Sequence, residues 1–205
     1  ASDVGFVRVE DTSSPTVVAA ADFTVALDAS GAYNVSVGEA VASSADNCAV
    51  ASVTLDRTEF SCSDVGSSFT VTATATDTSG NQATDSVSVS VVDTTLPTVT
   101  SVGTFNVTLN ATGLASVSVA SLVSSSGDNC GVSVTADKTV FSCADAGANV
   151  VTLTAVDPSG NNATATVTVF VSDDEVPSVV AAADFTVALD ASGAYNVSVG
   201  EAVAS

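Results

Sequence analysis

The chain has 205 residues, of which 23 are acidic, 3 are basic and none is histidine, so its formal net charge is −20. A surface this acidic repels nucleic acid and anionic membranes, and neither is expected as a partner. Hydrophobic residues, chiefly Val and Ala, make up 46% of the chain and can form a core. No apolar run approaches the roughly 20 residues of a membrane-spanning helix, so no membrane insertion is expected.

The predicted elements are short strands in which apolar and polar residues alternate. Strands are expected at residues 16–19, 23–27 and 33–37, and Gly31 is predicted to make a hairpin turn between the last two. Further strands follow at 50–55 and 59–62, and a final hairpin joins 69–76 to 83–92 through Thr78-Ser79-Gly80-Asn81. No segment has a convincing helical period. About seven strands in about 80 residues is typical of an immunoglobulin-like β-sandwich.

The chain is internally repetitive. Residues 17–43 recur letter for letter at 179–205, and a weaker repeat of about 80 residues lies within that longer one. The fold is therefore predicted to be all-β, with tandem immunoglobulin-like sandwiches of about 80 residues arranged end to end. Four segments are expected: 1–14 as the last strand and linker of a preceding repeat, 15–95 as repeat version 1, 96–175 as version 2, and 176–205 as the first strands of another version 1. The chain is thus interpreted as a window from a longer array.

The four cysteines fall in two pairs of similar spacing, Cys48 with Cys62 and Cys130 with Cys143. Disulfides in an oxidising compartment fit better than a zinc site, because the chain has no histidine and no Cys-x-x-Cys pair. Four cysteines allow three connectivities, and only the pairs Cys48–Cys62 and Cys130–Cys143 stay within one unit, so these are predicted. The alternative is free, buried thiols.

Acidic residues recur at equivalent places in each unit. They lie at the junctions, before the first cysteine and at the start of the last hairpin: Asp11, Asp46, Asp77, Asp93, Asp128, Asp157 and Asp173. Calcium prefers about six to eight oxygen ligands, and carboxylates from a junction and the adjoining loops would supply roughly half of them. These seven residues are therefore calcium-site candidates. The alternative is ordinary turn chemistry, because Asp and Asn hydrogen-bond their own backbone in turns.

The order Asp-Asn-Cys, Phe-Ser-Cys, Asp-x-Ser-Gly-Asn and Asp-x-x-x-Pro, which occurs twice, resembles hyalin-type and bacterial immunoglobulin-like repeats. Such repeats occur in giant cell-surface adhesins, notably those exported by type IX secretion in gliding and predatory marine bacteria, the marine Bacteroidota. The resemblance implies an extracellular, surface-anchored or shed filament protein.

The function expected is a structural stalk segment of a long adhesin or filament for cell-surface attachment. It would space a distal tip, itself outside this segment, from the cell, and that tip would bind a surface or prey-cell ligand. The partners of the segment would be the neighbouring repeats of the same chain. The alternative is a filament in which chains assemble laterally as homo-oligomers, and a third possibility is a glycan- or protein-binding module. An enzyme is not expected, because a serine nucleophile would lack a histidine base and acids that recur with the period serve the repeat.

Overall fold

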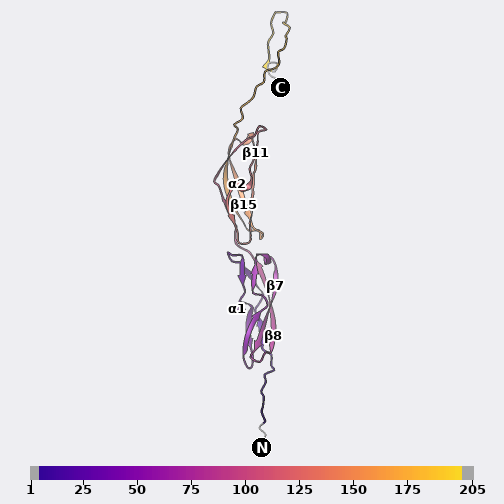
Figure 1. The fold of residues 1–205 in the computed structure, drawn as a ribbon, viewed down its shortest axis with the longest axis vertical. Coiled ribbons are helices and arrows are strands. Elements are labelled where there is room, and N and C mark those ends of the chain that lie inside the picture. The colour runs from indigo at the N-terminus through magenta and orange to yellow at the C-terminus, as the bar shows by residue number, and fades with distance from the viewer. Residues whose placement is uncertain (1–4, 200–205) are drawn as a thin grey trace.

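The computed structural model describes residues 5–199. Residues 1–4 and 200–205, the outer ends of the predicted segments 1–14 and 176–205, lie outside the described residues. Two β-sandwiches are arranged one after the other along the long axis of the molecule (Figure 1). The connection between them runs over residues 93–97, and the chain enters and leaves as extended segments.

The first sandwich has a four-stranded sheet in the order β2-β8-β7-β5, opposed by the pairs β1-β4 and β3-β6. Strand β2 runs parallel to β8, and the other pairs are antiparallel. The strands are β1 (Thr16–Ala19), β2 (Phe23–Ala26), β3 (Ala32–Asn34), β4 (Val41–Ala45), β5 (Val50–Leu55), β6 (Glu59–Ser61), β7 (Ser68–Asp77) and β8 (Gln82–Val92). The predicted final hairpin is β7-β8, and it is confirmed.

The second sandwich repeats this plan, with the sheet β10-β16-β15-β13 and the pairs β9-β12 and β11-β14. Its strands are β9 (Thr98–Ser101), β10 (Thr104–Thr108), β11 (Leu114–Ser116), β12 (Val123–Gly127), β13 (Ser133–Ala136), β14 (Val140–Ser142), β15 (Gly147–Val156) and β16 (Asn162–Ser172). The all-β, immunoglobulin-like fold class is therefore as the repeat pattern predicts.

Each sandwich has its own core, built from the inward positions of the long β-hairpin. Val71, Val87 and Val89 are buried in the first core, as are Val151, Val167 and Val169 in the second. One larger residue from the Phe-Ser-Cys segment completes each core, Phe60 in one and Phe141 in the other. Alternation of period two thus places the β-branched residues inside, where burial of each contributes about 1.5–3 kcal/mol.

Two local predictions are wrong. Gly31 does adopt a left-handed conformation (φ 75°) in a turn, but the flanking strands do not form a hairpin, because β2 pairs with β8 and β3 pairs with β6. The strand expected at 33–37 is also shorter than predicted, because β3 ends at Asn34 and Val37 begins the helical turn α1 (Val37–Ala40). The second sandwich has the equivalent turn α2 (Val119–Leu122). In α1, the Glu39 carboxylate accepts a hydrogen bond from the Ser36 backbone N–H (2.8 Å), which closes a capping box too short to leave a periodic signal.

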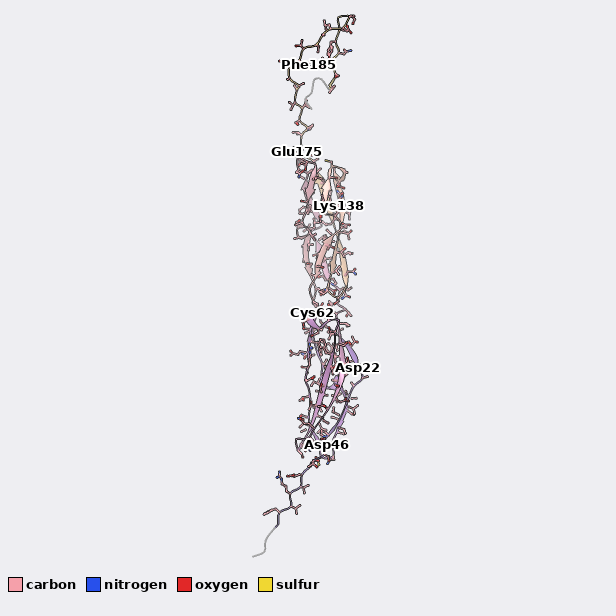
Figure 2. All side chains as sticks on the ribbon, turned by 90° about the vertical axis from the view of Figure 1, so that its right-hand side faces the viewer. Asp22, Asp46, Cys62, Lys138, Glu175 and Phe185 are labelled. Carbon is pink, nitrogen blue, oxygen red and sulfur yellow. A yellow bond between two sulfur atoms is a disulfide. The ribbon has the colours of Figure 1, made fainter. Side chains whose placement is uncertain are left out.

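The terminal segments do not form the strands predicted for them. Residues 5–10 carry no strand, and within 176–199 no extended strand pairing is present. Val187 and Leu189 are 37% and 65% exposed. Val25 and Leu27, their counterparts in the identical stretch of sequence, are 3% and 5% exposed. Val25 and Leu27 belong to the first core, where β2 pairs with β8, and no such sheet packs on Val187 and Leu189 within the described residues. Figure 2 shows Phe185 on this segment, beyond the second sandwich.

Candidate metal centres at the joints

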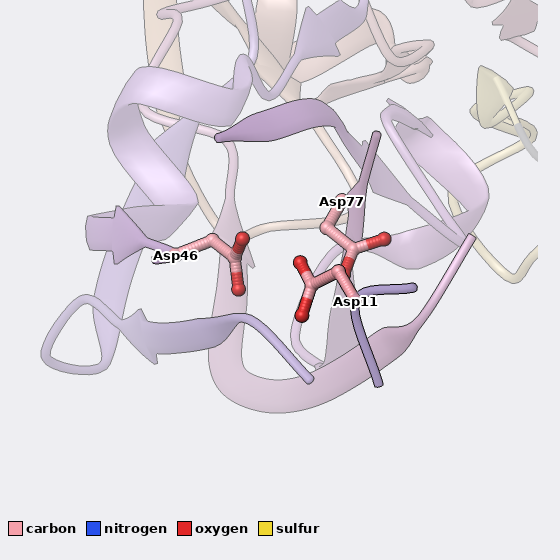
Figure 3. Close-up of side chains that lie close together, drawn as sticks. All are labelled: Asp11, Asp46 and Asp77. Carbon is pink, nitrogen blue, oxygen red and sulfur yellow. The ribbon is translucent and has the colours of Figure 1, made fainter. Parts of the chain in front are cut away.

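Three carboxylates converge at the N-terminal end of the first sandwich. Asp11 precedes β1, Asp46 follows β4, and Asp77 ends β7. One oxygen from each lies within 4.8 Å of the others, and the carboxylates face one another (Figure 3). Three segments far apart in the sequence therefore form one acidic centre.

An equivalent centre lies at the joint between the two sandwiches. Asp93 comes from the connection, Asp128 from the loop after β12, and Asp157 from the residue after β15. Their oxygens also lie within 4.8 Å of one another. Asp93 and Asp157 are only 6% and 5% exposed, so this centre is more deeply buried than a surface turn.

The acid that opens the last hairpin is fixed by its own turn. Asp77 Oδ1 accepts hydrogen bonds from the backbone N–H groups of Ser79 and Asn81, each 2.8 Å long. Asn81 Nδ2 also donates to Asp77 Oδ2 (2.7 Å) and to the Asp11 carbonyl oxygen (3.1 Å). Burial, the largest single influence, favours the neutral acid, but these hydrogen bonds outweigh it and lower the pKa of Asp77.

The second centre is built in the same way. Asn161 Nδ2 donates to Asp157 Oδ2 (2.7 Å) and to the Asp93 carbonyl oxygen (3.2 Å), and it thereby ties the connection to the hairpin turn. Burial opposes ionisation of Asp157, but the hydrogen bonds from Asn161 and its neighbours lower its pKa. The Asp128 Oδ2 atom accepts a hydrogen bond from the Cys130 backbone N–H (2.8 Å), which fixes the orientation of this carboxylate.

The remaining carboxylate oxygens have no donor. Asp11 Oδ2 and Asp46 Oδ1 in the first centre are buried and have no hydrogen-bond partner within residues 5–199, and the same holds for Asp93 Oδ2 and Asp128 Oδ1 in the second. Turn chemistry explains the other oxygens of these residues and leaves these four unexplained. A buried, unpaired carboxylate oxygen is costly, so a cation bound at either centre would stabilise it.

Charge and geometry both fit a divalent cation. Two carboxylates about 5 Å apart repel each other by about 3 kcal/mol at an effective dielectric constant near 20, and each centre holds three such pairs. Calcium binds oxygens at about 2.3–2.6 Å, so two ligands of one ion lie no more than about 5 Å apart. The 4.8 Å limit on the oxygens meets that condition. Asp11, Asp46 and Asp77 could hold one ion and Asp93, Asp128 and Asp157 another, with water completing the coordination.

The seventh candidate, Asp173, is exposed and is not brought into an acidic cluster among the described residues. It accepts a hydrogen bond from the Glu175 backbone N–H (3.2 Å) at the far end of the second sandwich, where Figure 2 labels Glu175. Its counterparts Asp11 and Asp93 each meet two acids from the sandwich that follows them.

The predicted disulfide pairing is wrong. The structure joins Cys62 to Cys130, across the two sandwiches, and leaves Cys48 and Cys143 as free, exposed thiols. Cys48 lies beside Asp46 at one end of the first sandwich, whereas Cys62 lies at the other end, against the second sandwich (Figure 2). Strand β5 carries the chain between these ends, and its six residues span about 20 Å. A disulfide needs Cα atoms within about 7 Å, as in Cys62–Cys130 at 5.3 Å.

The disulfide and the second acidic centre share one loop. Asp128 contributes to the centre, Cys130 forms the disulfide, and Asn129 lies between them. Asn129 Nδ2 donates to the Asp28 carbonyl oxygen of the first sandwich (3.0 Å) and to Asp93 Oδ1 (3.2 Å). Cys130 also packs against the first core. The Asp128–Cys130 loop therefore joins the second sandwich to the first, through the disulfide and the hydrogen bond to Asp28.

The residues that sequence reasoning missed are asparagines, namely Asn81, Asn129 and Asn161. Each occurs in a repeated motif, Asp-Asn-Cys or Asp-x-Ser-Gly-Asn, which gave the available signal. Their role is to hold the connection and the loops together, as the hydrogen bonds to the Asp11, Asp28 and Asp93 carbonyl oxygens show.

No protein-family model matches the sequence, and no curated protein matches it. Among solved structures, the chain is similar to the protocadherin GammaB4 extracellular domain (16% identity, 83% of this chain and 34% of that one, TM-score 0.33). It is also similar to Sidekick-1 immunoglobulin domains 1–4 (11%, 77% and 48%, TM-score 0.39) and to the titin I-band fragment I67–I69 (13%, 80% and 67%, TM-score 0.35). The chain spans about a third to a half of the first two. Among residues 5–199, no helix is long and apolar enough to cross a membrane.

Proposed function

We propose that this chain is a structural stalk segment of a long extracellular repeat protein that attaches to or extends from a cell surface, and that calcium stiffens its joints. The observation that carries the proposal is the buried acidic centre of Asp93, Asp128 and Asp157, with two carboxylate oxygens that have no partner among the described residues. The centre lies where two sandwiches meet, so an ion there would act on the geometry of the array.

The joint is short and already constrained. The connection between β8 and β9 contains only residues 93–97, and Pro97 is buried. Asn161 of the last hairpin donates a hydrogen bond to the Asp93 carbonyl oxygen at the start of this connection. The Cys62–Cys130 disulfide also joins the Asp128–Cys130 loop of the second sandwich to the first sandwich. A flexible linker would need a longer Gly- and Ser-rich run. These features support a stiff spacer.

Calcium would supply the positive charge that this joint lacks. When bound, it would cancel the repulsion between the three carboxylates and fix the Asp93 connection against two loops of the second sandwich. The residues of the chain themselves hold the carboxylates in place through Asn161 and the Cys130 backbone N–H.

The chemistry available in the chain supports a non-enzymatic role. The sequence has no histidine to serve as a base. Its single lysine, Lys138, forms an ion pair with Asp145 and lies 5.1 Å from the centre of the Phe141 ring. The equivalent residue of the first sandwich is Arg57, which lies over the ring of Phe60. Attachment to a surface through a distal tip, and export by type IX secretion in a marine bacterium, are supported by the sequence resemblance alone.

Thermal unfolding of the full chain tests the calcium role. With calcium in excess of its dissociation constant by about a hundredfold, binding stabilises a folded site by about 2.7 kcal/mol, so the second sandwich should melt several degrees higher than in a chelator. Asp93→Asn should remove that increment. Asp174→Asn, which changes the charge equally at an exposed position outside both centres, should retain it. Equal melting curves with calcium and with chelator would refute the calcium role, and the same shift with magnesium would assign the site to another cation.

The alternative function, a laterally assembled filament, is favoured by one difference between the two repeat versions. Val150 and Phe170 lie diagonally on β15 and β16 and are 70% and 44% exposed. The first sandwich has Thr70 and Ser90 at the equivalent positions. A face that is apolar in only one version would give lateral contacts a fixed axial repeat.

The double substitution Val150→Thr with Phe170→Ser gives the second sandwich the surface of the first. Analytical ultracentrifugation of the oxidised chain should show any concentration-dependent association disappear in this variant, with the melting temperature unchanged. A chain that stays monomeric at every concentration would exclude the laterally assembled filament.

A further inference from the structure

The Cys62–Cys130 disulfide closes a large ring of chain around the joint. It joins two residues that are 68 positions apart in the sequence, with their Cα atoms 5.3 Å apart. Cys62 follows β6 in the first sandwich, and Cys130 lies between β12 and β13 in the second. The ring, residues 62–130, therefore crosses the joint twice, once through the disulfide and once through the connection 93–97.

The ring contains part of each sandwich. From the first it holds the β7-β8 hairpin, which contributes Val71, Val87 and Val89 to the core, and from the second it holds β9 to β12. Outside the ring lie β1 to β6 of the first sandwich and β13 to β16 of the second. Each sandwich is thus divided between the ring and the chain outside it.

Tension along the chain has two covalent routes across the joint. One passes through the disulfide, and the other follows the chain from Cys62 through the connection to Cys130. The route through the disulfide is 68 residues shorter. At about 3.4 Å for each extended residue, the two routes differ by about 230 Å when the chain is unfolded. Once a sandwich opens, the shorter route becomes taut and the ring stays slack.

The positions of the two ends of the shorter route matter for the first sandwich. The N-terminal segment enters beside Asp46, because Asp11 lies in the same acidic centre, and Cys62 lies at the opposite end (Figure 2). Tension therefore acts along the length of the sandwich and separates the strands outside the ring from those inside it.

The strand pairs at this boundary are the ones that tension must break. In the first sandwich β2 pairs with β8 and β5 pairs with β7, each pair having one strand inside the ring. In the second sandwich the equivalent boundary lies between β10 and β16. The β7-β8 hairpin lies wholly inside the ring, so it is not stretched even when the strands that pair with it are removed.

We propose that the Cys62–Cys130 disulfide limits the extension of the chain under tension and keeps the connection 93–97 out of the stretched path. This further function rests on the proposed stalk role, because a stalk that tethers a cell is pulled along its axis. It does not depend on calcium. The acidic centres act on the geometry of the folded joint, whereas the disulfide acts on the length of the unfolded chain.

Reduction by a dithiol removes the limit. One thiolate of the dithiol attacks a sulfur of the Cys62–Cys130 bond and releases the other cysteine as a thiolate, and the second thiolate of the dithiol then releases the first cysteine. The dithiol loses two electrons and two protons and becomes a disulfide, while the two cysteines become thiols. The connection 93–97 then carries the whole tension across the joint.

The test stretches the full chain by its two ends in a single-molecule force experiment, in the presence of a chelator, before and after treatment with dithiothreitol. The contour length of the fully unfolded chain should be about 230 Å longer after reduction. A gain of only about 50–90 Å would mean that cysteines are linked within each sandwich, and it would overturn the proposal. Equal contour lengths before and after reduction would overturn it as well.

Two double substitutions are matched to each other. Cys62→Ser with Cys130→Ser should give the longer contour length with or without dithiothreitol, and this length is measured on the unfolded chain, so it does not require the variant to fold. Cys48→Ser with Cys143→Ser removes the two free thiols and should keep the difference of about 230 Å. A dependence on dithiothreitol in the first variant, or its loss in the second, would contradict the assignment.

The outcome is separate from the calcium role. Because the chelator is present throughout, a chain that binds no calcium should still show the full difference in contour length. Conversely, equal contour lengths would remove the limit on extension and leave the effect of calcium on melting as it is.

Discussion

The repeat predicts which residues lie at the joints, but it does not predict which of their atoms have hydrogen-bond partners. Six of the seven aspartates predicted as calcium ligands converge in two centres, because each motif returns to the same place in each sandwich. The unpaired oxygens that distinguish a cation site from turn chemistry could not be read from the sequence, since Asp in a turn and Asp at an ion have the same spacing.

One residue carries backbone strain that its repeat equivalent avoids. Ala49 has φ 128°, whereas Gly131 occupies the same place after the second Asp-Asn-Cys loop with φ 97°. Ala49→Gly should therefore raise the stability of the first sandwich, and Gly131→Ala should lower that of the second, each by about 1 kcal/mol. Urea unfolding at neutral pH measures both. A loss of stability in Ala49→Gly would mean that this conformation costs nothing.

At the level of elements, turns form locally but strands need partners. Asp28 Oδ1 accepts hydrogen bonds from the backbone N–H groups of Ser30 and Ala32, and Asp190 accepts the same two from Ser192 and Ala194. The turn thus survives in the C-terminal segment, where the strands beside it do not form. The predicted hairpin around Gly31 failed for the related reason that a tight turn does not dictate which strand its neighbours pair with.

The 3-10 turn η1 (Cys62–Asp64), which presents Cys62 to the second sandwich, is held by an ion pair. The hydrogen bond from Arg57 (2.7 Å), helped by the Ser61 backbone N–H, lowers the pKa of Asp64 below 3.8. A depressed pKa adds stability above pH 3.8 that is lost as the pH falls through the folded-state value. Asp64→Asn should cost about 1 kcal/mol at pH 7 and progressively less at lower pH.

Unfolding of wild type and Asp64→Asn at pH 7 and at pH 2.5, with chelator present, measures this difference. Asp174→Asn serves as the exposed control and should match the wild type at both values. A gap between wild type and Asp64→Asn that is the same at the two pH values would show that the charge of Asp64 does not contribute.

At the scale of the whole molecule, the fold class was predictable and the covalent link was not. Period-two alternation and the repeat lead directly to two sandwiches. The pairing of cysteines depends on which end of a sandwich each one occupies, and spacing along the chain gives the opposite answer, since Cys48 and Cys62 are neighbours in sequence and a strand length apart in space. The disulfide between the two sandwiches could be predicted only from the way the sandwiches are arranged in space.

The shared loop predicts that the disulfide and the ion support each other. Opening Cys62–Cys130 frees the loop that carries Asp128, and ordering about one residue again on binding costs 1–2 kcal/mol. Reduction of the disulfide should therefore lower the calcium affinity of the centre formed by Asp93, Asp128 and Asp157 by roughly tenfold. The Asp11, Asp46 and Asp77 centre has no disulfide within the chain and is the internal control. Unchanged calcium affinity at both centres after reduction would show that the disulfide and the ion do not support each other.

The most direct measurement is the number of calcium ions that the oxidised chain binds, by isothermal titration calorimetry at neutral pH. The two acidic centres predict two ions per chain, one ion in Asp93→Asn and two in Asp174→Asn. No calcium heat in the wild type, or the same two ions in Asp93→Asn, would contradict a joint stiffened by calcium.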